Sequence, residues 1–316
     1  MHILLTGGAG FIASHLAERI LRDGHALTII DDFNDFYDPK LKRGNIEILG
    51  RIGKVDLIEG DIRDSLLVNS LFVNRKFDQV VHLAARAGVR PSIKDPQLYV
   101  DTNVTGTLNL LSSAQKAKVP KFVLGSTSSV YGVNSKVPFS ETDAILHSIS
   151  PYAATKLCAE QLCHNYHHLY GMEVVIPRFF TVYGPRQRPE MAIYKFTQAI
   201  LRGEPIEMYG DGSMRRDFTY VTDIADGVYA AMQRKLGYEI INLGDSNTVE
   251  LKYLISLIEK AAGKKAKIKQ LPEQPGDVPV TFANIEKARR LLGYEPKVKI
   301  EKGIEQFVAW YKGQKQ

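Results

Sequence analysis

The sequence has few of the residues that mark a secreted, metal-binding or membrane-spanning protein. Its 316 residues include two cysteines, Cys158 and Cys163, and their spacing suits neither a metal quartet nor a disulfide framework. No apolar run approaches the length of about 20 residues that a membrane-spanning helix needs. The chain also reaches a glycine-rich loop at Gly7 with no basic leader or cleavage site before it. We therefore expect a cytoplasmic protein with no metal site and no membrane segment.

The sequence also has no strong excess of positive or negative charge. Lysine and arginine number 41 against 35 aspartates and glutamates, which gives a net charge of +6. The one basic run, 264–269, contains no aromatic residue. Such a run is more typical of a solvated surface than of a nucleic-acid site. We expect no nucleic-acid partner, and the positive surplus would equally suit a small anionic substrate.

Short apolar runs alternate with amphipathic segments through the first half of the chain. This order predicts strands joined by helices, and hence an α/β fold with a doubly wound parallel sheet. After Thr181, loops rich in Pro, Gly and Arg carry shorter helices near 190–202, 222–234, 250–261 and 284–292. We expect a first domain over 1–178, to which 220–245 returns, and a smaller mixed α/β domain over 179–316. The predicted strands are His2–Thr6, Ala26–Asp31, Val55–Glu59, Gln79–His82, Lys121–Gly125 and Glu173–Arg178.

A glycine-rich turn follows the first predicted strand. Gly7 allows the tight turn, Gly10 lets the backbone approach a phosphate, and Ala13 takes the third small position, where a helix packs closely on the strand. The helix that follows runs to about Asp23, so the turn presents N–H groups at a helix N-terminus, where a pyrophosphate binds. The turn therefore predicts a Rossmann dinucleotide-binding domain.

Two further acidic positions refine this cofactor site. Asp31 ends the second predicted strand, where a carboxylate accepts hydrogen bonds from the adenosine ribose and repels a 2′-phosphate. NAD is thus favoured over NADP. Asp61 and Ile62 follow the third strand and could flank the adenine, but Asp61 as the N-cap of the next helix explains its position almost as well.

Tyr152 and Lys156 open a predicted helix after Ser150 and Pro151, and their spacing places both on one face. A lysine ammonium beside the phenol, together with a cationic nicotinamide ring, would lower the pKa of Tyr152 and let it accept a proton. Thr127 lies in a hydroxyl-rich segment after the fifth strand and is a candidate proton relay. The alternative is a loop hydroxyl that satisfies its own backbone.

Seven segments together resemble the extended short-chain dehydrogenases of the NAD-dependent epimerase/dehydratase family, which modify nucleotide sugars. The resemblance implies an NAD domain, a nucleotide-sugar domain and a homodimer, with Thr127, Tyr152 and Lys156 as catalytic residues. It also implies cofactor contacts at Phe11, Ile12, Asp32, Leu83, Ala84, Ala85 and Asn103, although Asn103 could equally be a polar residue on a helix face. The segments are TGGAGFIA, IIDDFND, VHLAARAGVRPS, GSTSSVYG, YAATK, PRFFTVYGP and DGSMRRDFTYVTD.

The residues after Thr127 bear on the reaction. Members of the family first oxidise a sugar hydroxyl at C4, with hydride passing to NAD, and differ in the fate of the resulting 4-keto sugar. The 4,6-dehydratases carry Asp-Glu after this threonine, and UDP-glucuronate decarboxylases carry Glu two residues after it, whereas this chain has Ser128 and Ser129. Without a second acid or base, the 4-keto intermediate takes the hydride back on its other face. The resemblance therefore implies C4 epimerisation.

The predicted substrate is a UDP-uronic acid. Galactose-type epimerases have Asn where Thr181 stands, and the segments 186–192 and 87–92, which includes Arg90, resemble UDP-glucuronate 4-epimerases. A uronate needs a partner for its carboxylate, and arginine offers a bidentate fork. Arg188 is the best placed by the resemblance; its alternative is a stem packed over the pocket rim. We expect Arg188 to hold the carboxylate in the plane of the 4-ketone and so suppress loss of CO2.

Two more residues are assigned by the resemblance alone. Arg216 matches the arginine that binds the diphosphate, and Asp277 matches a residue near the nucleotide ribose. Gln274 stands where many relatives have Arg, which leaves the diphosphate contacts open. The predicted substrate contacts are Arg90, Thr127, Ser128, Ser129, Thr181, Arg188, Arg216 and Asp277.

Two other functions remain possible at this point. One is a UDP-glucose or UDP-N-acetylglucosamine 4-epimerase, in which the arginines near position 188 would only line the pocket. The other is a sensor that binds NAD and a nucleotide sugar without turnover. The intact Thr127, Tyr152 and Lys156 argue against the sensor.

Overall fold

A parallel sheet forms the larger part of this computed structural model, which describes residues 1–133, 136–272 and 280–314. The strands run in the order β3-β2-β1-β4-β5-β7-β11, with β6 paired to β7, and every pair is parallel. This confirms the predicted α/β fold. The strands are β1 (His2–Thr6), β2 (Ala26–Asp31), β3 (Val55–Glu59), β4 (Gln79–His82), β5 (Lys121–Leu124), β6 (Ser126–Thr127), β7 (Glu173–Phe179) and β11 (Tyr238–Leu243).

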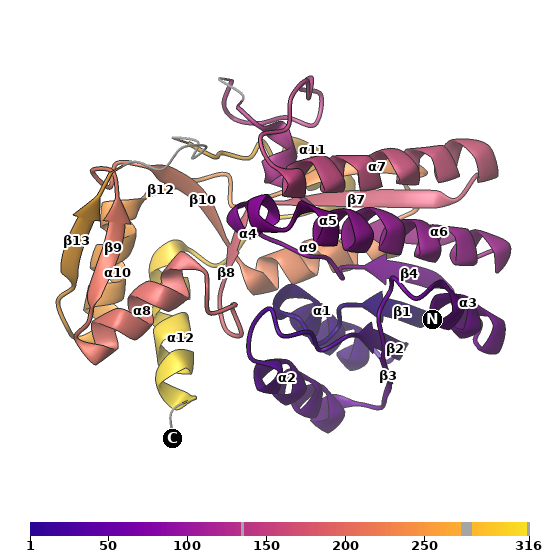
Figure 1. Cartoon of the computed structure of the whole chain (residues 1–316), viewed down its shortest axis with the longest axis horizontal. Helices are drawn as coiled ribbons and strands as arrows, with labels where there is room; N and C mark the ends of the chain where they lie inside the picture. The colour runs from indigo at the N-terminus through magenta and orange to yellow at the C-terminus, as the bar shows by residue number, and fades with distance from the viewer. Residues whose placement is uncertain (134–135, 273–279, 315–316) are drawn as a thin grey trace.

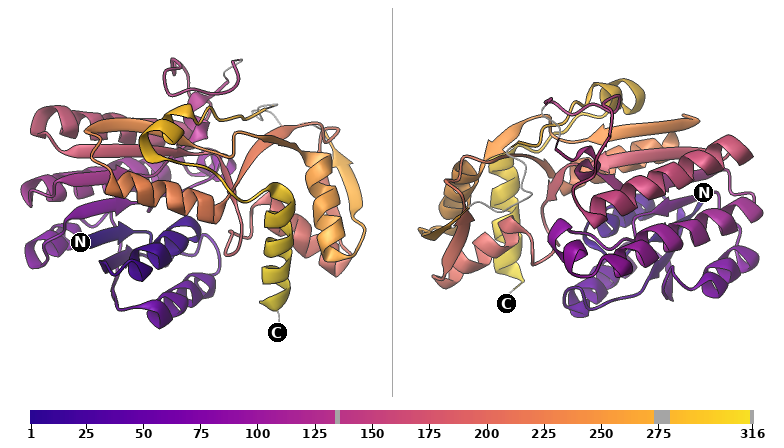
Figure 2. Two further views of the ribbon diagram at one scale, coloured as in Figure 1. Left: turned by 180° about the vertical axis from the view of Figure 1, so that it is seen from behind. Right: turned by 45° about the horizontal axis from the view of Figure 1, so that its top comes forward.

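Helices bury both faces of this sheet. Along β1, Ile3 and Leu5 enter the hydrophobic core on one side and Leu4 the core on the other, as alternation along a buried strand requires. Figure 1 shows α6 and α7 on one face, and the reverse view in Figure 2 shows α9 across the other. One side is covered by α1 (Phe11–Arg22), α2 (Pro39–Ile52), α9 (Val221–Gln233) and α11 (Glu286–Leu292), the other by α3 (Ser65–Asn74), α6 (Gly106–Lys116) and α7 (Pro151–Tyr170).

A smaller mixed region lies beside the sheet region and has a hydrophobic core of its own (Figure 1). It contains the strand sets β12-β10-β8 and β13-β9. Its elements are β8 (Thr181–Tyr183), α8 (Ala192–Arg202), β9 (Pro205–Tyr209), β10 (Arg215–Tyr220), β12 (Thr248–Glu250), α10 (Leu251–Ala262), β13 (Lys267–Leu271) and α12 (Ile300–Gly313).

The chain crosses between the two regions more than once. After β10, α9 packs against α1 and β11 pairs with β7, so the segment expected to return toward the first domain lies in the large sheet. Helix α11 also packs against α9 and β11. The division into domains at residue 178 stays a prediction.

Several elements were not predicted individually. Helix α12 is one, although Ile304, Phe307, Val308 and Tyr311 repeat at helical spacing and are buried. The short strands of the smaller region are others, because three to six residues carry too little periodicity to be recognised. The remaining short helices are α4 (Val89–Lys94), α5 (Pro96–Val100), the π-helix η1 (Asp101–Thr105) and the 3-10 helix η2 (Ser128–Tyr131). Among the described helices, none is both long and apolar enough to cross a membrane.

The strand order fixes where a ligand can bind. The order reverses between β1 and β4, and in open α/β sheets the crevice at the carboxyl ends of strands flanking such a reversal holds the ligand. The loops after β1, β2, β3 and β4 all leave the sheet at that edge.

Candidate active site

A cavity of about 390 Å³ opens at this edge of the sheet. The loops after the first four strands, the segment 125–129, the start of α7 and the segment 179–191 line it. Most of the predicted site residues meet here, although they are far apart in the sequence. Those lining the cavity are Gly7, Gly10, Phe11, Ile12, Asp31, Asp32, Asp61, Ile62, Leu83, Ala84, Ala85, Thr127, Ser128, Ser129, Tyr152, Lys156, Thr181 and Arg188.

The glycine turn after β1 is built for close approach. Gly7 has φ +69°, and a Cβ there would lie 2.7 Å from Cα of Ala84. A Cβ on Gly10 would lie 3.0 Å from the Gly7 carbonyl oxygen. Gly10 is the N-cap of α1, so the first N–H groups of this helix open toward the cavity without intrahelical partners. The turn fits a pyrophosphate, as the sequence predicts.

The carboxylate of Asp31 fastens this turn to the end of β2. It accepts hydrogen bonds from the backbone N–H groups of Ala9, at 3.1 Å, and Phe33, at 3.0 Å. Burial raises the pKa of Asp31, and these two hydrogen bonds oppose that rise. Lys42 also lines the cavity and donates to the Asn34 carbonyl oxygen at 2.8 Å. This part of the cavity therefore contains a carboxylate and an ammonium group, and the ammonium group was not predicted from the sequence.

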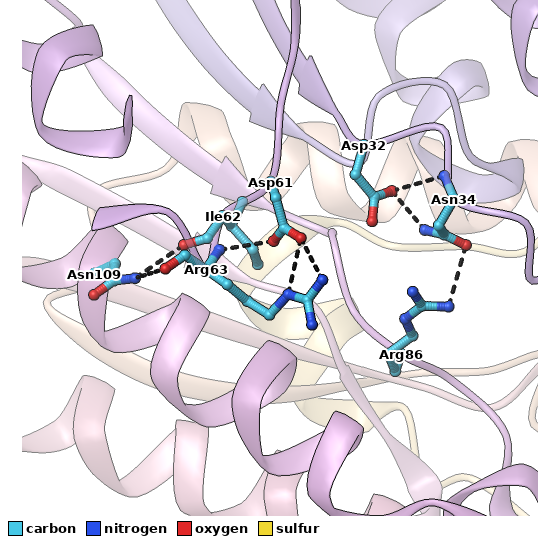
Figure 3. Close-up of polar contacts among 7 residues, drawn as sticks. All are labelled: Asp32, Asn34, Asp61, Ile62, Arg63, Arg86 and Asn109. Atoms are coloured by element: carbon cyan, nitrogen blue, oxygen red, sulfur yellow. Dashed lines mark hydrogen bonds and ion pairs between the residues drawn. The ribbon is translucent and has the colours of Figure 1, made fainter. Parts of the chain in front are cut away.

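Asp61 does not cap the next helix. Asp64 caps α3 by accepting from the N–H groups of Leu66 and Leu67, so the capping alternative for Asp61 is wrong. Asp61 instead accepts three hydrogen bonds from Arg63, at 2.6 to 2.8 Å (Figure 3). Asn109 of α6 holds the same turn by donating to the carbonyl oxygens of Ile62 and Arg63.

A second set of polar contacts connects the loops after β2 and β4. Asn34 donates to Asp32 through both its backbone and its side-chain nitrogen, and Arg86 donates to the Asn34 side-chain oxygen at 3.3 Å (Figure 3). Asn103 lies behind this segment, where it contacts the backbone N–H and carbonyl of Arg86. Asn103 is 1% exposed and is not part of the cavity lining, so its predicted contact with the cofactor stays a prediction.

Helix α7 places Tyr152 and Lys156 as predicted. The Ser150 hydroxyl caps the helix by accepting from Ala153 N–H at 3.1 Å, and Pro151 occupies the first helical position. Tyr152 and Lys156, one turn apart, both line the cavity. The edge of Tyr152 also meets the Tyr99 ring, with centroids 6.2 Å apart.

In the protein alone, the pKa of Tyr152 is shifted upward. Burial raises it above its ordinary value, and both hydrogen bonding with Thr127 and the charge of Arg188 oppose that rise. Burial also lowers the pKa of Lys156, to about 8. The protein groups alone therefore keep Tyr152 protonated, and the lowering expected from Lys156 together with a cationic nicotinamide ring stays a prediction.

A buried ion pair holds this helix against the neighbouring strands. The Glu160 carboxylate, one turn beyond Lys156, accepts from Arg178 Nε at 3.0 Å and Nη2 at 2.6 Å. Ser126 Oγ donates to the same carboxylate at 2.5 Å. Because Ser126 precedes Thr127 in β6, this network fixes the position of Thr127 relative to the helix that carries Tyr152.

The hydroxyl-rich segment makes local hydrogen bonds as well as lining the cavity. Thr127 Oγ1 accepts from Ser129 N–H at 3.1 Å and lies 3.2 Å from Ser129 Oγ. The alternative, in which the Thr127 hydroxyl only makes hydrogen bonds within its own loop, therefore holds in part. Thr127 and Tyr152 both line the cavity, and the role of Thr127 as a relay stays a prediction.

Arg188 lines the cavity. Burial raises the pKa of Tyr152, of Tyr99 and of Tyr37, and the positive charge of Arg188 opposes the rise in each case. A guanidinium at the rim could act on the phenols in the same way, so the role of Arg188 stays a prediction.

The loop that carries Arg188 is fastened to α1. Arg186, with φ +65°, pairs with Glu18 and donates to Ser14 Oγ at 3.3 Å. His15 contacts the Pro185 carbonyl oxygen at 3.0 Å. These contacts connect the helix behind the glycine turn to the segment that supplies Arg188.

Two predicted substrate contacts do not line the cavity, and a third falls outside the described residues. Arg90 is exposed on α4 and lies 5.2 Å from the Tyr209 ring centroid, while Arg86 of the same sequence segment lines the cavity. Arg216 on β10 donates to the Arg215 carbonyl oxygen and does not line the cavity. Asp277 lies outside the described residues, as does Gln274. The roles assigned to all three stay predictions.

Several cavity residues were not predicted from the sequence, and five of them carry polar or aromatic side chains that follow the carboxyl ends of β2 and β4: Asn34, Phe36, Tyr37, Lys42 and Arg86. A loop at that sheet edge is a signal that could have indicated them. Within the described residues, no group of His, Cys, Asp and Glu is arranged to hold a metal ion.

Comparison with known proteins places this geometry in a family. The family model described as GDP-mannose 4,6 dehydratase matches residues 4–307. A UDP-glucuronate 4-epimerase from Thermodesulfobacterium geofontis is 44% identical over 312 residues, covering 98% of this chain and 96% of that protein.

Solved structures resemble this one closely. The crystal structure of a Bacillus cereus UDP-glucuronic acid 4-epimerase, in complex with UDP-glucuronic acid and NAD, has a TM-score of 0.93 at 39% identity, covering 99% of this chain and 100% of that one. A UDP-glucose 4-epimerase from Thermotoga maritima has a TM-score of 0.92 at 32% identity, with both chains fully covered. The chain belongs to the NAD-dependent epimerase/dehydratase family, in which the matching model carries the description GDP-mannose 4,6 dehydratase.

Proposed function

We propose that this protein is an NAD-dependent isomerase that interconverts UDP-glucuronate and UDP-galacturonate by epimerisation at C4. The observation that carries the proposal is the placement of Arg188 in the same cavity as Tyr152, near enough for its charge to act on the phenol. Relatives over nearly the full chain are UDP-glucuronate 4-epimerases. We also propose that the enzyme acts in the cytoplasm as a homodimer.

The cavity suits NAD. The Gly7–Gly10 turn and the start of α1 would hold the pyrophosphate, and Asp31 and Asp32 lie where the adenosine ribose would bind. Bound NAD would supply a hydride acceptor and donor. The crowding of Gly7 against Ala84 supports this assignment, because only a bare backbone can come so close.

Tyr152 is the acid and base of the proposed reaction. It would take the proton from the sugar 4-hydroxyl and return it after the hydride has moved, and Thr127, which lines the same cavity, is the proposed proton relay. Since burial holds the phenol protonated in the protein alone, turnover requires that the contents of the cavity lower this pKa. Lys156, whose pKa is about 8, adds a positive charge near the working pH.

Ser128 and Ser129 support epimerisation over dehydration. Both line the cavity beside Thr127, at the positions where the related dehydratases carry Asp-Glu. Serine hydroxyls do not serve as acid or base near neutral pH, so the 4-keto sugar can only be reduced again. Reduction from the opposite face gives the epimer.

Arg188 gives the proposed preference for a uronic acid. Its guanidinium can bind a carboxylate through two parallel hydrogen bonds. A 4-keto uronic acid is a β-keto acid, which loses CO2 when the breaking bond overlaps the carbonyl π system. Holding the carboxylate in the plane of the ketone would suppress that loss.

The test is to incubate the purified enzyme with UDP-glucuronate, without added NAD, and to follow the sugar anomeric signals by proton NMR while measuring CO2. We expect UDP-galacturonate to form without CO2. Turnover of UDP-glucose in place of UDP-glucuronate would overturn the uronate assignment, and no turnover of either sugar would favour a sensor. A dimer is tested separately by light scattering.

A further inference from the structure

The guanidinium of Arg188 is held on two sides. Glu190 Oε1 lies 3.2 Å from Nε of Arg188, at one edge of the planar group. Cζ of Arg188 lies over the Phe36 ring, 5.7 Å from the ring centroid. The ion pair and the cation–π contact together restrict the position of the guanidinium.

These contacts leave the guanidinium able to bind a ligand. A guanidinium binds a carboxylate bidentately through two of its three nitrogens. Glu190 pairs with Arg188 through the ion-pair contact at Nε. Nη2 makes a long contact of 3.9 Å with the Met191 sulfur, which competes little with a charged acceptor. A sugar carboxylate in the cavity can therefore displace this weak contact and bind the guanidinium.

Phe36 connects this arginine to the ribose end of the site. Its N–H donates to Asn34 Oδ1 at 3.2 Å, and Asn34 is bonded in turn to Asp32 and Arg86 (Figure 3). Lys42 holds the same loop through the Asn34 carbonyl oxygen. The loop 32–37 thus reaches from the ribose end of the cavity to the face of Arg188.

We propose that Glu190 and Phe36 are positioning residues that hold the Arg188 guanidinium in place for the substrate carboxylate, and so set the preference for UDP-uronic acids over neutral UDP-sugars. The inference rests on the proposed function. Neither residue needs to touch the substrate. Their effect should therefore appear in the binding of a carboxylate and be absent in the binding of UDP-glucose.

The experiment compares Glu190→Gln, Phe36→Leu and Phe36→Tyr in the full-length enzyme. We expect Glu190→Gln to raise the KM for UDP-glucuronate by about three- to tenfold, the effect of weakening one charged contact. Phe36→Leu should raise it by about two- to fivefold, and Phe36→Tyr, which keeps the ring face, should restore it. The KM should change more than kcat in each case. The inhibition constant of UDP-glucose should stay at the wild-type value.

Two controls separate positioning from a general structural effect. Glu305→Gln removes an exposed carboxylate that pairs with Lys302 on α12. It should change neither the KM for UDP-glucuronate nor the inhibition constant of UDP-glucose. In an Arg188→Ala background, Glu190→Gln should have no further effect on the KM, because the group it positions is gone. Thermal unfolding curves of each variant establish that it is folded.

The outcomes are distinct. If wild type fails to epimerise UDP-glucuronate, the proposed function fails and the inference fails with it. If wild type epimerises it, the inference alone is overturned by any of three results. The first is a KM for UDP-glucuronate in Glu190→Gln that is unchanged or lower. The second is a change in the UDP-glucose inhibition constant as large as the change in that KM. The third is an undiminished effect of Glu190→Gln on the KM in the Arg188→Ala background.

Discussion

Replacing Arg178 should destabilise the protein strongly, because the buried Glu160 carboxylate then loses its ion-pair partner. Glu160 is fully buried and Arg178 is 3% exposed. Two hydrogen bonds of 3.0 and 2.6 Å join them, and Arg178 also lies 4.8 Å from the centroid of the Tyr131 ring. In Arg178→Met, the carboxylate keeps a hydrogen bond from Ser126 and the nearby charge of Lys156 but loses its ion-pair partner.

The expected loss is about 3–5 kcal/mol of unfolding free energy, the cost of breaking a buried ion pair on one side. A chain of 316 residues has a large unfolding entropy, so each kcal/mol shifts Tm by about 1.5 °C, and the total shift is about 5–8 °C. Urea and thermal unfolding followed by far-ultraviolet circular dichroism measure both quantities.

A double-mutant cycle tests the reason for the loss. Glu160→Leu together with Arg178→Met removes both charges and should cost at least about 2 kcal/mol less than the sum of the single variants. The surface pair of Arg289 and Glu295, with side chains 48% and 63% exposed, is the control, and Arg289→Met should cost less than about 1 kcal/mol. Additive single effects, or a loss in Arg178→Met no larger than in the control, would refute the reasoning.

Four further predictions concern the site. Tyr152→Phe should lower kcat by about 10²–10⁴-fold while UDP-glucuronate still binds, measured by turnover and calorimetry; residual activity near wild type would exclude it as the acid and base. Arg188→Ala should raise the KM for UDP-glucuronate by about 10- to 100-fold and release CO2 with a UDP-pentose, detected by NMR. If neither effect is observed, Arg188 only covers the rim of the pocket. Burial lowers the pKa of Lys156 to about 8 in the folded protein, whereas the pKa of a lysine in the unfolded chain is about 10.4. Between these two values only the unfolded chain holds the proton, so the free energy of unfolding rises from about pH 8 to about pH 10. Lys156→Met should abolish that rise and be more stable than wild type by about 3 kcal/mol near neutral pH in urea unfolding without ligand; an equal pH slope in both proteins would contradict it. Gly7→Ala should yield protein purified without NAD, measured by absorbance of released nucleotide, whereas Gly24→Ala, also at positive φ (+75°) but in open space, should retain it.

Local features of the sequence were enough for the main elements of the fold. The predicted strands coincide with β1 to β5 and β7 to within one residue, because buried parallel strands appear as short apolar runs between glycine turns and helices. The pairing of Tyr152 with Lys156 follows from helical spacing after a Ser-Pro cap. The glycine turn likewise carries its own conformation, since Gly7 must adopt positive φ.

Other features could not be predicted from residues close together in the sequence. Asp61 was compatible with a helix cap, but Asp64 takes that role and Asp61 pairs with Arg63. Arg86 and Arg90 belong to one motif, and only the fold distinguishes which of them lines the cavity. The return of β11 to β7 depends on packing between segments far apart in the sequence.

The sequence by itself determined the order of the main strands and helices of the large sheet, the glycine turn after the first strand and the placement of Tyr152 and Lys156 on one helix, because each depends on periodicity or on contacts within a few residues. The tertiary structure decided the electrostatics of these two residues and the setting of Arg188. Burial, which no short segment controls, raises the pKa of Tyr152 in the protein alone. Phe36 reaches Arg188 only because the loops after β2 and β8 meet at one edge of the sheet.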